Sequence, residues 1–114
     1  MDAQSILAQL MAVIEDRKAN PPPKSYTTSL FNGGVEKIGG KILEEAREVV
    51  EAAGEAGDEG RKHLIYEAAD LIYHLFVMLG HREIELAEVE SELARRFGIS
   101  GIDEKAARKK SEGQ

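Results

Sequence analysis

The stretch LIYEAADLIYHLFVML, residues 64–79, constrains the fold more than any other part of this 114-residue chain. As a helix it is apolar over most of its circumference, so most of its surface needs cover. A chain of this size builds only one modest core. We therefore expect the other helices to pack on this segment and a second copy to cover the rest, as a helical-bundle homodimer.

The other hydrophobic patterns also repeat at helical spacing, and no stretch has the pattern of a convincing strand. Three prolines in NPPPK and the glycines of GEAGDEG separate the helical segments. The sequence thus predicts an all-α, four-helix bundle. Its expected helices cover about residues 3–18, 35–53, 61–79 and 85–97. The hydroxyl-rich stretch SYTTSLFNGG is expected to lead into the second helix, and the fourth is expected to bury Leu86, Val89, Leu93 and Phe97.

The expected domain organisation is simple. One domain covers residues 1–98, with its core over about 25–98, and a charged, mobile tail covers 99–114. The tail carries basic residues that either remain solvated or close over an anionic substrate: Lys105, Arg108, Lys109 and Lys110.

Composition excludes several classes of protein. The net charge of −6, from 15 Lys and Arg against 21 Asp and Glu, argues against binding to nucleic acid or anionic membranes, which requires a basic surface. No run approaches the roughly 18 apolar residues of a membrane span. The absence of cysteine excludes disulfides and thiolate metal sites and fits a cytoplasmic protein.

Four glutamates in the second helix fall on different sides of its helical wheel. Glu44 and Glu51 lie opposite the apolar stripe, where a solvated acid belongs, whereas Glu45 lies beside the stripe and Glu48 is next to Glu45. Two acids are therefore expected on the surface and two toward the packing face. The stripe consists of Val35, Ile38, Ile42, Ala46, Val49, Val50 and Ala53.

The few polar residues of the apolar third helix gather on one narrow flank. They are Glu67, Asp70 and His74, with His81 further along. Unpaired ionised carboxylates in such a place would cost several kcal/mol each or would take up protons. A divalent cation removes this cost.

An antiparallel hairpin of the second and third helices would bring the two acid pairs together. Glu45 and Glu48 would then face Glu67 and Asp70, giving four oxygen ligand groups on two rigid helices. Such a set is typical of Mg²⁺, with Mn²⁺ as a substitute, and not of Zn²⁺. Glu44 remains a candidate accessory ligand.

Alternative interpretations exist for each of these residues. The acids of EEARE alone are weak evidence, because acid-rich helix faces are usually solvated, and Glu67 and Asp70 could pair instead with Lys37, Lys41 or Arg47. His74 is either a packing residue or a residue outside the ligand set that holds a carboxylate. A di-iron site is disfavoured because no Glu-x-x-His occurs. Two histidines are expected at helix ends on the surface, His63 and His81.

EEARE (44–48), followed after 18 intervening residues by EAAD (67–70), resembles the EExxE…ExxD pattern of the MazG-like, all-α nucleoside triphosphate pyrophosphohydrolases. Within that superfamily the chain is most similar to the phosphoribosyl-ATP pyrophosphatase family, which acts second in histidine biosynthesis. The supporting segments are SYTTSLF (25–31), GGVEKIGGKILEEAREVVEAA (33–53), LIYEAADLIYHLFVML (64–79) and GISGIDEKAARK (98–109).

The resemblance implies Mg²⁺-dependent hydrolysis of the α–β phosphoanhydride of phosphoribosyl-ATP to phosphoribosyl-AMP and pyrophosphate. It assigns catalysis and metal binding to Glu45, Glu48, Glu67 and Asp70, with Glu48 or Glu45 as the general base. It also implies a homodimer with the site near the subunit interface, and a pathway neighbour, phosphoribosyl-AMP cyclohydrolase, that takes the product.

Five further residues are candidates for substrate binding. Lys41 and Lys37 lie one and two turns before the acids and could meet phosphate oxygens, although a salt bridge from Lys41 to Glu45 is an equal alternative. Ser25 and Thr27 could donate hydrogen bonds, and Tyr26 could stack on a base. Capping of the loop is the competing account for these three.

Three hypotheses about function follow. The first is the phosphoribosyl-ATP pyrophosphatase reaction. The second is a house-cleaning pyrophosphohydrolase that uses the same metal site on canonical or damaged (d)NTPs. The third is a non-enzymatic helical dimerisation module, which requires neither the metal nor the buried acids.

Overall fold

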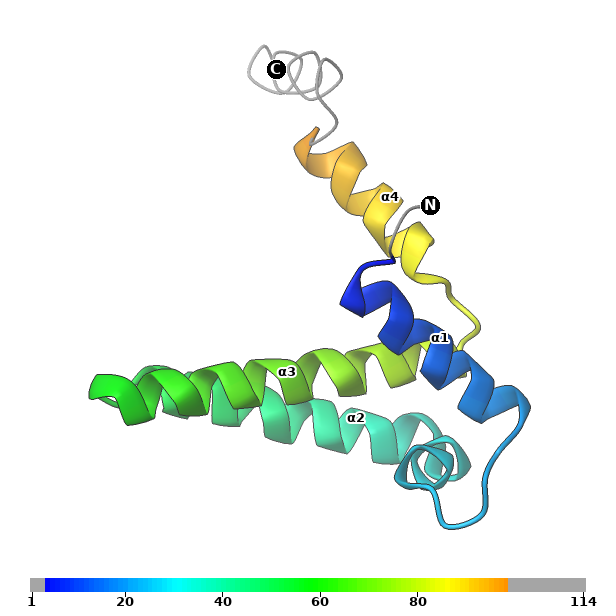
Figure 1. Ribbon diagram of the computed structural model, residues 1–114, viewed down its shortest axis with the longest axis horizontal. Helices are drawn as coiled ribbons and strands as arrows, with labels where there is room; N and C mark the ends of the chain where they lie inside the picture. Colours follow the sequence, from blue (N-terminus) through cyan, green and yellow to red (C-terminus); the bar gives the residue numbers. More distant parts are fainter. Residues whose placement is uncertain (1–3, 99–114) are drawn as a thin grey trace. The chain divides into compact units, whose positions relative to one another are not determined.

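The computed structural model describes residues 4–98, and these form four α-helices without a strand (Figure 1). The all-α fold class predicted from the sequence is thus confirmed. The basic residues of the expected tail lie outside the described residues. The helices are α1 (Ile6–Ala19), α2 (Tyr26–Ala53), α3 (Gly57–His81) and α4 (Leu86–Phe97).

The helices α2 and α3 form the expected antiparallel hairpin and lie side by side along their length (Figure 1). The helix α1 packs on α3 and more lightly on α2, and together the three form one compact unit that ends at Ile84. The helix α4 belongs to a second unit. None of the helices within residues 4–98 combines the length and the apolar character that a bilayer crossing requires.

The helix α2 begins at Tyr26, nine residues before the start that the sequence suggested, so the segment expected to lead into the helix is itself helical. The helix is interrupted at Gly34, directly before the expected start. Ser25 caps this first segment, because its hydroxyl accepts a hydrogen bond from the backbone N–H of Thr28 at 3.3 Å. Leu30 is fully buried and anchors the segment. Gly34 then bends the helix, since its φ of 68° lies in the left-handed region that favours glycine.

The helix α3 also begins earlier than expected, at Gly57 instead of Arg61. The two helices are separated only by the short turn from Gly54 to Ala56. Asp58 and Glu59 belong to the first turn of α3, where acidic side chains suit the positive end of the helix dipole. The hairpin is therefore longer than the glycine pattern suggested.

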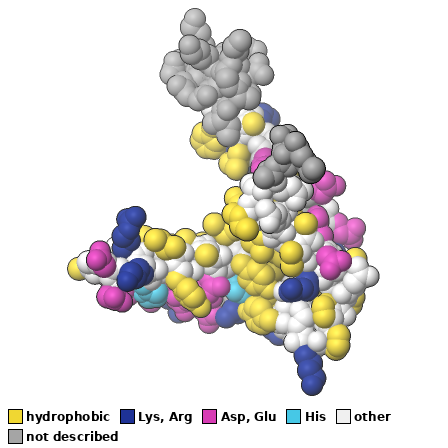
Figure 2. All heavy atoms as spheres, viewed as in Figure 1, with side chains coloured by type: hydrophobic (Ala, Val, Ile, Leu, Met, Phe, Trp, Pro, Cys, Tyr) yellow, Lys and Arg dark blue, Asp and Glu magenta, His cyan; other side chains and the backbone are white. Residues whose placement is uncertain are grey.

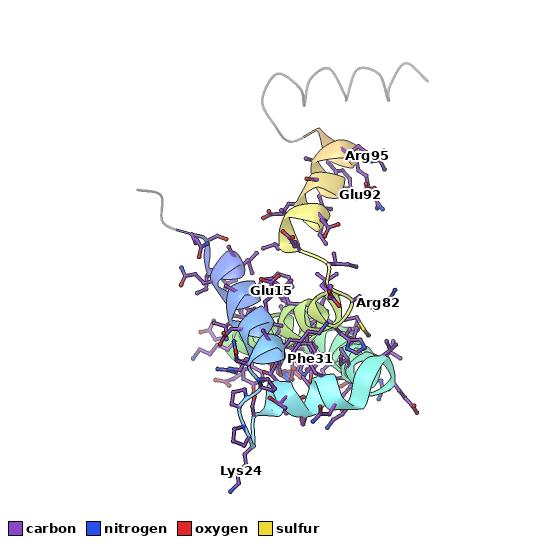
Figure 3. All side chains as sticks on the ribbon, turned by 90° about the vertical axis from the view of Figure 1, so that its right-hand side faces the viewer. Glu15, Lys24, Phe31, Arg82, Glu92 and Arg95 are labelled. Carbon is purple, nitrogen blue, oxygen red and sulfur yellow. The ribbon has the colours of Figure 1, made fainter. Side chains whose placement is uncertain are left out.

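The core of the first unit lies where α1, α2 and α3 meet, and Phe31 lies among the side chains there (Figure 3). Lys18 joins α1 to this junction, because its ammonium group donates to the carbonyl oxygens of Gly80 and His81 at 3.0 and 2.9 Å. The buried apolar side chains are Met11, Ile14, Leu30, Ile38, Ala52, Phe76 and Val77.

The expected apolar stripe of α2 and the expected burial of α3 are only partly correct. Val35 and Val50 are 53% and 72% exposed in the single chain, and Ile65 and Leu75 of α3 are 60% and 44% exposed. The wheel places residues on a face, but only the neighbouring helices decide which faces are covered. Much apolar surface thus remains open.

The helix α4 starts at Leu86, with the backbone N–H of Glu85 donating to the Glu88 carboxylate at 2.9 Å. Glu92 pairs with Arg95 on the same side of this helix (Figure 3). The expectation that α4 buries Leu93 and Phe97 was wrong for the single chain, where they are 43% and 61% exposed. The described residues do not provide enough cover for this face.

Candidate functional site

Three carboxylates converge between the two hairpin helices. Oxygen atoms of Glu45 from α2 and of Glu67 and Asp70 from α3 all lie within 4.8 Å of one another. Glu45 is 4% exposed and Glu67 is 6% exposed, whereas Asp70 is half-buried. Acidic and histidine side chains follow the lower edge of the hairpin (Figure 2). The structure thus brings together three of the four predicted ligands.

Two oxygens of this cluster are buried without a hydrogen-bond partner among the described residues. They are Oε2 of Glu45 and Oε1 of Glu67. A buried polar atom that lacks a partner costs on the order of 1–3 kcal/mol, and more when it carries charge. The donor set consists of hard carboxylate oxygens, which is the chemistry that Mg²⁺ and Mn²⁺ prefer. The cluster therefore fits a divalent cation.

Glu48 lies half-buried beside the three carboxylates, outside the tight group of oxygens. The pKa of Glu48 is raised, mainly by the nearby carboxyl group of Glu67. Burial, and then the neighbouring carboxyl groups of Glu67, Asp70 and Glu48, raise the pKa of Glu45 from its ordinary 4.5 to about 7. Without a cation, Glu45 is thus partly protonated near neutral pH.

His63 is a contact of the site that sequence reasoning missed. Its Nε2 lies 3.0 Å from Oε2 of Glu67, and its Nδ1 lies 3.0 Å from both carboxylate oxygens of Glu55. Hydrogen bonds to Glu55 and then to Glu67 raise the pKa of His63. The available signal was spacing, because His63 lies one turn before Glu67 on the face that also carries Asp70 and His74.

The two candidate phosphate-binding lysines differ in their surroundings. The ammonium group of Lys41 lies 2.5 Å from Glu44 and 3.8 Å from Glu45, at the rim of the cluster. Lys37 is exposed, and its aliphatic chain lies close to Gly33. Glu44 and Glu51 are exposed, as the wheel predicted. Lys41 is therefore the better placed cation.

Tyr26 reaches the site through His74. Nδ1 of His74 donates to the backbone carbonyl oxygen of Asp70 at 2.8 Å, so in the neutral ring Nε2 accepts from the Tyr26 hydroxyl, also at 2.8 Å. His74 is buried and holds Tyr26, not a carboxylate side chain. The ring of Tyr26 is half-exposed and stacks on Tyr73, with ring centroids 6.3 Å apart.

The other two hydroxyl residues have structural partners. Thr27 is buried, and its hydroxyl lies 2.5 Å from the Tyr73 hydroxyl. Ser25 caps α2, as described above. These contacts tie the start of α2 to α3 beside the carboxylates.

Comparison with known proteins identifies relatives along nearly the whole described chain. The family described as phosphoribosyl-ATP pyrophosphohydrolase matches residues 7–97. A protein named phosphoribosyl-ATP pyrophosphatase from Rhodopirellula baltica is 57% identical over 90% of this chain and 85% of its own length. Proteins of the same name from Trichlorobacter lovleyi and Geobacter sulfurreducens are 55% and 49% identical, over 93% and 94% of this chain and 95% and 96% of their own lengths. The chain therefore belongs to the phosphoribosyl-ATP pyrophosphohydrolase family.

Proposed function

We propose that this protein hydrolyses the α–β phosphoanhydride of phosphoribosyl-ATP to phosphoribosyl-AMP and pyrophosphate, the second step of histidine biosynthesis. Family membership supports the reaction. The observation that carries the chemistry is the pair of buried carboxylate oxygens on facing helices that have no hydrogen-bond partner in the part of the chain that the structure describes. A site of this kind suits a phosphorylated substrate that arrives with a divalent cation.

We assign Mg²⁺, with Mn²⁺ as a substitute, to Glu45, Glu67 and Asp70, and Glu48 completes the set from the adjacent turn of α2. When bound, Mg²⁺ neutralises phosphate charge and lowers the pKa of a coordinated water. Oε2 of Glu45 and Oε1 of Glu67, which lack hydrogen-bond partners among the described residues, are suited to direct metal contact.

The remaining residues bind substrate and handle the proton. Glu48 or Glu45 acts as the general base, since both carboxylates lie on α2 at the cluster. Lys41 contacts phosphate oxygens from the rim, and Lys37 is the second candidate. Tyr26, held by His74, presents a half-exposed ring for stacking.

The active form is proposed to be a homodimer. In the single chain, an apolar groove runs between α1 and α3, and hydrophobic side chains gather where these helices cross (Figure 2). Because such a patch is costly in water, a second copy is the expected cover. The groove is lined by Ile6, Leu7, Gln9, Leu10, Val13, Ala69 and Ile72.

The proposed setting is the cytoplasm. There the product would pass to phosphoribosyl-AMP cyclohydrolase, the neighbouring enzyme of the pathway. Nucleic acid is not an expected partner, because the net charge of the chain is −6.

Product analysis tests the proposed reaction. The purified protein is incubated with phosphoribosyl-ATP and Mg²⁺, with ATP and dNTPs in parallel and with chelator as a control. We expect pyrophosphate from phosphoribosyl-ATP alone and a loss on the order of a hundredfold in Asp70→Asn. Cleavage of simple nucleoside triphosphates instead would assign the site to house-cleaning, and no turnover of any substrate would leave only a dimerisation role.

A further inference from the structure

Three residues form a line of contacts from the α2–α3 turn to the carboxylate cluster. Glu55 in the turn contacts Nδ1 of His63, and Nε2 of His63 contacts Oε2 of Glu67, with every distance at 3.0 Å. An ionised carboxylate only accepts hydrogen bonds, so the ring nitrogens of His63 are the donors, and donation from both at once requires the protonated imidazolium form of the ring. The Glu67 carboxylate is thereby held on one side by the imidazole.

The two oxygens of Glu67 are in different surroundings. Oε2 faces His63, whereas Oε1 is buried without a hydrogen-bond partner among residues 4–98. A carboxylate fixed through one oxygen cannot rotate freely, so the other oxygen keeps one direction. Residues that orient a ligand in this way tune its affinity for a metal.

The turn is shaped so that Glu55 comes close to α3. A methyl group at position 60 would collide with the backbone carbonyl of Glu55, and only glycine leaves this space open. Gly60 itself is buried and lies three residues before His63 on α3. The close approach of the Glu55 backbone at this point brings its carboxylate to the imidazole.

We propose that His63 is a positioning residue for the metal site, which orients Glu67 while Glu55 holds the imidazole ring. The inference rests on the proposed metal-dependent function. His63 contacts neither the proposed phosphate-binding Lys41 nor Tyr26 among its hydrogen bonds. Its loss should therefore weaken metal binding more than substrate binding.

The test measures Mn²⁺ binding to the full chain by electron paramagnetic resonance and by calorimetry. We expect His63→Ala to weaken Mn²⁺ binding about tenfold or more. His63→Gln retains an amide N–H that can reach Glu67 and should restore affinity to within about threefold of wild type. Lys62→Ala, at the exposed neighbouring position, is the matched control and should bind as wild type does.

Kinetics provide a second readout. For His63→Ala, the Mg²⁺ concentration that gives half-maximal rate should rise, while the KM for phosphoribosyl-ATP at saturating Mg²⁺ stays close to that of wild type. Thermal unfolding of each metal-free variant shows whether the fold is retained.

The outcomes separate this inference from the function on which it rests. A wild-type chain that neither binds Mn²⁺ nor turns over substrate would overturn both. Wild-type activity together with unchanged Mn²⁺ affinity in His63→Ala would refute the positioning role alone. Equal losses in His63→Ala and His63→Gln, with a lowered unfolding temperature in both, would make His63 a structural residue and also refute the proposal.

Discussion

Glu45 shows how much of the site individual residues can reveal. Its place beside the apolar stripe predicted that it would be drawn inward, and the structure buries it with an oxygen that has no hydrogen-bond partner within residues 4–98. Glu67 and Asp70 follow the same logic, because an acid on an apolar helix needs a partner. His63 was missed because its i,i+4 relation to Glu67 looks like any surface pair until the turn brings Glu55 to its other nitrogen.

At the residue scale, we predict that the metal-free protein loses stability as pH rises. The pKa of Glu45 is raised from 4.5 to about 7 in the folded state, so the folded chain binds more protons than the unfolded chain in that interval. The contribution of Glu45 is fully present below pH 4.5 and is lost as pH rises through about 7. Urea unfolding in chelator, followed by circular dichroism, measures this slope.

Glu45→Gln provides the control for that slope. A neutral amide removes the buried charge, so above neutral pH the metal-free variant should be more stable than wild type by about 1 kcal/mol. Mg²⁺ should stabilise the wild type and leave the variant unchanged. A wild-type stability that does not change with pH, or a variant that is weaker throughout, would contradict the expectation.

At the scale of the elements, periodicity located four helices but not their ends. The segment at 26–33 has few apolar residues, so only its packing, with Leu30 buried and Thr27 bonded to Tyr73, explains why it is helical. The bend at Gly34 has the same origin, because a positive φ cannot be inferred from a glycine pair alone. Contacts between helices, and not local preference, decide these boundaries.

Substitution of Lys18 tests how much the contacts between helix ends stabilise the fold, because Lys18 joins the end of α1 to the end of α3. Its ammonium group satisfies two carbonyl oxygens at the negative end of the α3 dipole and lies 6.0 Å from the centre of the Phe31 ring. We expect Lys18→Met to lower the free energy of unfolding by about 1.5 kcal/mol.

Chemical denaturation measures the effect of Lys18→Met. Lys24→Met is the matched control, because the Lys24 side chain projects away from the helices in the loop before α2 (Figure 3). Equal stabilities of the two variants would show that the Lys18 contacts contribute nothing.

At the scale of the whole molecule, apolar surface is exposed in the single chain, although the sequence predicts that this surface is covered. On α3, Ile65, Ala69 and Ile72 follow one another at helical spacing, and all are exposed. They lie on a different face from Glu67 and Asp70. One helix thus has a side that carries the carboxylate cluster and an uncovered side, as expected for a subunit of a larger bundle.

We therefore predict that Ile72→Glu converts the proposed homodimer to a monomer. Burial of a carboxylate without a partner in an apolar interface costs several kcal/mol, which exceeds what a small interface tolerates. Analytical ultracentrifugation over a range of concentrations measures the change. Lys62→Glu, which places the same side chain at an exposed polar position of α3, should remain dimeric. A wild type that sediments as a monomer would refute the proposed assembly.

Helical periodicity and turn residues act over a few positions, so the fold class, the hairpin and the acid pairs follow from the sequence alone. Packing between the helices decides which oxygens converge. It also decides that Tyr26 is held by His74, and that His63 links the turn to Glu67. These contacts join residues on separate elements, or depend on a turn that places a distant backbone against a helix. Their geometry follows from packing, which no local pattern encodes.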